Sequence, residues 1–160
     1  MNPSRSGRIW IANQVFTHSI ALSGTLAMFD VVGPFPLEPA FDKVRVCAFS
    51  VGIDDTGNSG KLQCQGFDGG IQFLSPGGAV VFTLQLATEW VGALFNLPDT
   101  GPVAIQPSSP LAIDVDAIAN LSGPIASAQF FAEARVNNSD AGAAHTLGVQ
   151  ILGLLESLSL

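Results

Sequence analysis

The chain has 160 residues, of which 48% are hydrophobic and only 12% charged, so it is not natively disordered and fits one folded domain. Its 17 glycines and 10 prolines exclude a helical bundle or coiled coil. The net charge of −7, from 13 acidic and six basic residues, argues against nucleic-acid binding by the folded body.

The N-terminus differs in charge from the rest of the chain. Two of the six basic residues, Arg5 and Arg8, lie in the first eight positions. We interpret residues 1–8 as a flexible N-terminal arm and residues 9–160 as a single β-sandwich domain. Arg5 and Arg8 are therefore candidates for contacting an acidic partner surface. Polar residues interrupt the apolar stretches near both ends, so we expect neither a signal peptide nor a membrane span.

Short segments rich in Val, Ile, Phe and Thr alternate with clusters of Gly and Pro along the chain. This punctuation is typical of an all-β sandwich or barrel. The proline-containing connections 33–42 and 97–110 suit long crossovers between sheets. We predict an all-β fold: a two-sheet antiparallel β-sandwich, jelly-roll-like, with 8–9 strands. The predicted strands are 8–17, 20–32, 43–53, 60–67, 70–74, 79–90, 111–118, 125–137 and 145–155, the last of which would also suit a helix.

One turn signal is strong enough to suggest a register. The run Asp54-Asp55-Thr56-Gly57 favours a type I turn and predicts a hairpin between 43–53 and 60–67. In the register centred on that turn, Cys47 lies directly opposite Cys64. Two opposed cysteines can lie within disulfide range. Two buried reduced thiols are the alternative, because free cysteine packs as a small hydrophobe.

The residues that could carry chemistry are few. The sequence has no nucleophile elbow, metalloprotease helix or phosphate-binding loop. We therefore predict that the protein is not an enzyme and uses no cofactor or metal. We interpret His18 and His145 as structural or surface residues. Asp114 and Asp116 are expected on the polar outer face of one strand, and a cation site or a glycosidase pair is the alternative.

The aromatic residues are unusual. The chain has eleven Phe and two Trp but no Tyr, which indicates dry burial in a core or a subunit interface. Trp10 and Trp90 are candidates for core packing or for partner contact. A charge-poor sandwich has more apolar surface than one small domain needs to bury. We therefore expect a homo-oligomer, most simply a trimer.

The turn-rich strand pattern over residues 8–155, the small residues of 119–128 and 141–144, and the lack of enzyme motifs resemble small virion proteins of tailed bacteriophages. Among these, the pattern most resembles that of capsid decoration (cement) proteins with a jelly-roll-like body. This resemblance implies a virion protein, assembled in the host cytoplasm, whose trimers bind the major capsid protein or another virion protein and stabilise the capsid lattice. It implies no nucleic-acid or membrane partner. A carbohydrate- or receptor-binding module such as a fibre head, and a tail or connector component, are the alternatives.

Overall fold

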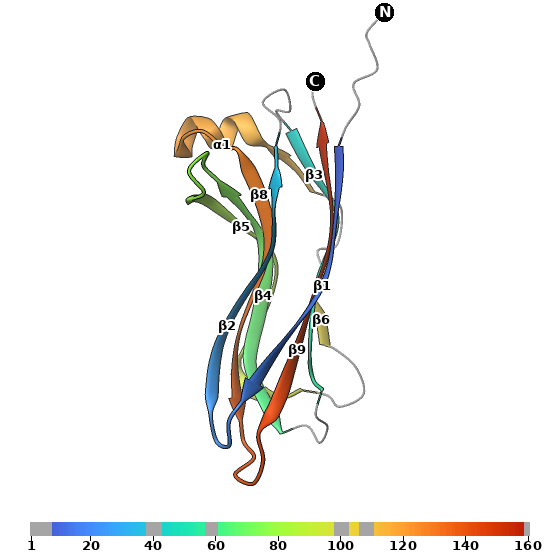
Figure 1. The fold of residues 1–160 in the computed structure, drawn as a ribbon, viewed down its shortest axis with the longest axis vertical. Helices are drawn as coiled ribbons and strands as arrows, with labels where there is room; N and C mark the ends of the chain where they lie inside the picture. The colour runs from blue at the N-terminus through green and yellow to red at the C-terminus, as the bar shows by residue number, and fades with distance from the viewer. Residues whose placement is uncertain (1–7, 38–42, 57–60, 98–102, 106–110, 159–160) are drawn as a thin grey trace, which may run out of the picture.

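A computed structural model describes residues 8–37, 43–56, 61–97, 103–105 and 111–158. Within these ranges, two antiparallel sheets face one another (Figure 1). The first sheet has the order β1-β9-β3-β6, with β7 also paired to β3, and comprises β1 (Arg8–Ile20), β9 (His145–Leu158), β3 (Lys43–Asp55), β6 (Val103–Ile105) and β7 (Leu111–Asp114). The second sheet, in the order β2-β8-β4-β5, comprises β2 (Thr25–Pro36), β8 (Ser127–Asn138), β4 (Leu62–Leu74) and β5 (Val80–Asn96).

Successive strands alternate between the two sheets along most of the chain. β1 and β3 belong to the first sheet, while β2 and β4 belong to the second, and β8 and β9 again lie in opposite sheets. This alternation is the connectivity of a jelly roll, so the predicted all-β sandwich is confirmed. The predicted crossovers 33–42 and 97–110 both lead from the second sheet to the first, although β2 extends to Pro36 and β6 lies within 97–110.

The core lies between the sheets and combines aliphatic side chains with several fully buried phenylalanine rings. Phe49 of β3 stacks on Phe130 of β8 at a centroid distance of 5.5 Å, which joins the two layers. Each such buried ring stabilises the fold by about 1.5–3 kcal/mol. Gly153 makes room for this pair, because a Cβ built at that position would stand 2.6 Å from the Phe130 ring.

The predicted hairpin between residues 43–53 and 60–67 is wrong. β3 pairs with β9, β6 and β7 in the first sheet, whereas β4 pairs with β5 and β8 in the second. Cys47 and Cys64 therefore lie in different sheets, and both are free thiols. A turn signal shows that the chain reverses. It does not show whether the returning strand hydrogen-bonds to its predecessor or crosses to the facing sheet.

β4 runs through the glycine pair at which we predicted a break between two strands. A register shift separates Gly69 from Gly70 in the pairing with β5. A Cβ at Gly70 would stand 2.0 Å from the carbonyl oxygen of Leu84, so only glycine fits that crossing. The glycines therefore mark a bulge inside one strand and not its end.

The predicted strand 111–118 is correct only for its first half. The strand ends at Asp114, and α1 (Val115–Ser122) follows it. Asp114 caps the helix, because its carboxylate accepts a hydrogen bond of 3.0 Å from the backbone N–H of Ala117. The C-terminal segment, which suited either structure, is the strand β9. No helix in the described ranges is long and apolar enough to cross a membrane.

Candidate assembly surface

The four residues predicted to contact partners do not form one cluster. Arg5 lies outside the described residues, and Arg8 begins β1 in an exposed position. Trp10 follows two positions later on β1. Trp90 belongs to β5, which lies at the opposite edge of the second sheet from β2, and its backbone faces Gly66. The structure therefore groups Arg8 with Trp10 and separates both from Trp90.

β1 and β2 run along one side of the sandwich, where each is the outermost strand of its sheet (Figure 1). Two contacts join these strands across the open edge. Trp10 packs against Phe35 with ring centroids 6.4 Å apart. His18 Nε2 lies 2.7 Å from a carboxylate oxygen of Asp30. Trp10 is thus half-buried against the core and does not stand out as a flat aromatic platform.

The outer face of β1 carries a row of exposed aliphatic side chains. Alternation along the strand turns Trp10, Ala12 and Phe16 toward the core, and Ile9, Ile11, Asn13 and Val15 toward solvent. Ile11, for example, is 74% exposed. Leu152 of β9 lies beside this row, opposite Asn13. We call these residues the β1 apolar row: Ile9, Ile11, Val15 and Leu152.

One acidic residue lies beside this row: Glu156 of β9 is the pairing partner of Ile9, and its carboxylate is ion-paired with Arg45. The chain carries 13 acidic residues, yet β1 contains none of them. β2 contains only Asp30, which is buried against His18. Two copies of a protein with a net charge of −7 repel one another over most of their surface. The outer face of β1 is therefore a place where copies can approach with few acidic groups meeting.

The acidic pair predicted on the strand 111–118 does not form. Asp114 is bound to the N-terminus of α1 and, at 3.1 Å, to the Lys43 ammonium, while Asp116 lies within the helix. The hydrogen bond from Ala117, and then the contact with Lys43, lower the pKa of Asp114. The predicted pair of carboxylates on one strand face is therefore wrong. Among the described residues, no group of three His, Cys, Asp or Glu side chains could hold a metal ion.

The cysteines fit the alternative of reduced thiols. Cys64 is fully buried and its thiol donates to the carbonyl of Gly66 at 3.1 Å. Burial raises the pKa of Cys64 to about 11, so the thiol stays protonated and unreactive near neutral pH. Cys47 is half-buried beside Glu156.

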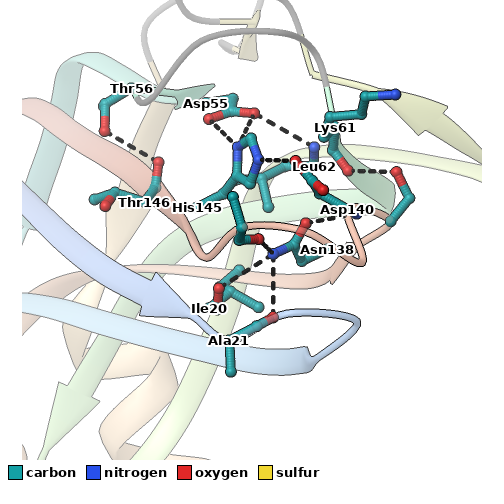
Figure 2. A network of polar contacts seen from close by, with 12 residues as sticks. Ile20, Ala21, Asp55, Thr56, Lys61, Leu62, Asn138, Asp140, His145 and Thr146 are labelled. Atoms are coloured by element: carbon teal, nitrogen blue, oxygen red, sulfur yellow. Dashed lines mark hydrogen bonds and ion pairs between the residues drawn. The ribbon is translucent and has the colours of Figure 1, made fainter.

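Both histidines have carboxylate partners. His145 begins β9 and is buried between two of them (Figure 2). Its Nδ1 lies 3.1 Å from Asp55 at the end of β3, and its Nε2 lies 3.0 Å from Asp140 in the turn before β9. The cluster holds the end of β3, the start of β9 and the turn before β9 together.

No protein-family model matches this sequence, and no characterised protein matches it in sequence. Solved structures do match its fold. A chain in the structure of infectious bursal disease virus, Gx strain, aligns over 96% of this chain with 12% identity and a TM-score of 0.56. A chain of the Gt strain aligns over 95% with 10% identity and a TM-score of 0.50. This chain spans only 32% and 40% of those viral chains, and at such identities the likeness shows the shared fold alone.

Proposed function

We propose that this protein is a non-enzymatic structural component of a virion that works by assembling with copies of itself. The observation that carries this proposal is the β1 apolar row on an edge strand without acidic residues. The fold, which is shared with chains of a virus particle, supports the virion setting.

β1 has 13 residues, so it offers a neighbouring copy a strand about 44 Å long at roughly 3.4 Å per residue.

Within this role we propose a capsid decoration, or cement, protein of a tailed bacteriophage, found in the virion after assembly in the host cytoplasm. Its trimers, in which each copy presents its β1 edge to the next, bind the major capsid protein or another virion protein. A protein that binds the assembled lattice better than its dissociated parts stabilises that lattice by mass action, and many copies multiply a modest contact. Arg5 and Arg8, before and at the start of β1, are proposed to meet acidic groups of the neighbour.

Light scattering coupled to size exclusion tests the assembly directly. We expect the intact chain to elute as a trimer, at three times the 16.6 kDa of one copy. Ile11→Lys places a charge in the β1 apolar row and should shift the protein toward monomer. Leu121→Lys is the matched control, because Leu121 is 89% exposed on α1, away from the edge. A monomeric wild type would overturn the proposal, as would equal dissociation by both variants.

Sedimentation with particles of the virus that encodes the chain tests the capsid contact separately. A decoration protein should pellet with expanded capsids and should protect them against heat. Pelleting with isolated tails instead would favour a tail or connector component and contradict the capsid assignment.

A further inference from the structure

The end of the sandwich away from α1 is held by one buried polar cluster. Asn138, at the end of β8, donates its side-chain amide to the carbonyls of Ile20 and Ala21 in the turn between β1 and β2 (Figure 2). The next residue, Ser139, donates from its backbone N–H and its hydroxyl to the carbonyl of Lys61, just before β4. His145 and its two carboxylates complete the cluster and attach the end of β3.

Both ring nitrogens of His145 face carboxylate oxygens, although its side chain is only 5% exposed. An imidazolium ion donates from both nitrogens, whereas a neutral imidazole has one N–H and one lone pair. Loss of the proton therefore turns one of the two contacts into a lone pair facing an anion. Only the charged ring satisfies this site.

The two carboxylates differ in burial, and therefore in whether they can turn away from the His145 ring. Asp55 is fully buried at the end of β3, and its carboxylate also accepts from the backbone N–H of Leu62 at 3.4 Å. Asp140 is 27% exposed in the turn between β8 and β9, where its other oxygen accepts from the N–H of Gly142 at 2.7 Å. When the ring becomes neutral, the exposed Asp140 can turn to water while Asp55 cannot.

We propose that protonated His145 is a pH-operated clamp that fixes the turn 139–144 to the end of the sandwich and releases it when the proton leaves. The clamp is independent of the proposed virion role, because it rests on contacts within one copy.

The surrounding charges favour the closed clamp. Asp54 precedes Asp55 and adds a third carboxyl group, whose own pKa is raised by burial and then by Asp55. Residues 57–60 contain no ionisable side chain, Lys61 follows them, and His18 with Asp30 forms a separate pair on β1 and β2. The hydrogen bond to Asp140, followed by that to Asp55, raises the pKa of His145 above 6.5 against the cost of burial. The same contact lowers the pKa of Asp140 below 3.8.

The direction of the pH effect follows from these shifts. A histidine whose pKa is raised by folding stabilises the fold fully below its unfolded value of about 6.5, and that stabilisation is lost as the pH rises through the folded value. Asp140 acts in the opposite sense, since its contribution is lost as the pH falls through its lowered pKa. The clamp is therefore closed in the range between the two and opens on the alkaline side.

Amide hydrogen exchange from pH 6 to pH 9, corrected for intrinsic exchange rates, tests the clamp. In the wild type we expect the protection of Asp140 and Gly142, whose N–H groups are bonded within the turn, to fall with rising pH. The fall should be about tenfold for each unit by which folding raises the pKa of His145. His145→Gln should remove this pH dependence. His18→Gln, which changes the other histidine bound to a carboxylate, should behave as the wild type.

Asp140→Asn is a second variant that keeps the histidine. An asparagine amide can donate to the neutral ring, so this variant should fold and keep its turn protected at pH 9. Nuclear magnetic resonance of the His145 ring gives an independent readout, with titration above 6.5 in the wild type and at lower pH in Asp140→Asn. Parallel protection profiles in wild type and His145→Gln would overturn the proposal. A wild-type ring that titrates at or below 6.5 would also overturn it.

Discussion

β1 and β2 run along the same side of the sandwich, but only β2 carries features that discourage another strand from pairing with it. β2 contains Pro34 and Pro36, which lack backbone N–H groups, and its pairing with β8 shifts register between Val32 and Phe35. Its exposed Phe29 lies stacked on Phe131, at 5.6 Å. Such features discourage another strand from pairing at an edge.

β1 lacks these features. It contains no proline, glycine, lysine or acidic residue, and among the described strands it pairs only with β9, in an unbroken register. It also carries most of the β1 apolar row. Edge strands of this length and character are usually covered by something. This comparison is the reason for placing the proposed assembly contact on β1 and not on β2.

The largest effect is expected at the contact that joins the two edge strands. Trp10→Ala should lower the free energy of unfolding by about 2–3 kcal/mol, somewhat less than the roughly 3–5 kcal/mol typical of a fully buried aromatic. Trp10 is only half-buried but packs against Phe35 and the core. Urea denaturation measures the change, with Leu121→Ala on α1 as a control expected to stay within about 0.5 kcal/mol. Equal effects of the two variants would contradict the packing described for Trp10.

A matched pair of valine substitutions tests which of the two edge strands carries the proposed self-association. Val15 is 61% exposed on β1, and Val31 is 36% exposed on β2. Val15→Lys should weaken self-association by about 1.5 kcal/mol, or roughly tenfold, because burial of that side chain is lost. Val31→Lys should leave association nearly unchanged. A dilution series followed by light scattering gives both constants, and a larger loss in Val31→Lys would assign the interface to β2.

The smallest effect is expected at the polar contact across the edge. Asp30→Ala removes the partner of His18, and we expect a loss of about 1 kcal/mol in the free energy of unfolding. The loss is modest because the His18 side chain is 28% exposed and can bind water instead. Thermal unfolding should show this as a drop of about 2–4 °C. A change as large as that of Trp10→Ala would mean that the polar contact, and not the aromatic one, holds the edge strands together.

The sequence predicts much of the local structure but little of the pairing. The predicted strand 79–90, for example, corresponds to most of β5. The turn after Asp55 is equally visible, yet its strands belong to different sheets. Asp114 looks like one more strand residue until its carboxylate is seen capping α1. A helix of eight residues is too short for its periodicity to stand out from that of a strand.

For the proposed assembly surface and the clamp too, the sequence reveals the residues but not the contacts between them. The sequence shows directly that residues 8–20 contain no acidic residue. Whether this strand lies at the edge of a sheet depends on which strands pair with it. His145 could be recognised as a structural residue, whereas its partner Asp55 lies 90 positions earlier in the chain.

The sequence by itself determined the all-β class, the approximate strands and the low charge, because these depend on local composition and a period of two. Only the tertiary structure decided the sheet of each strand, which strands form edges and what surrounds each histidine. These depend on contacts between distant segments, and the same alternating pattern can satisfy more than one pairing.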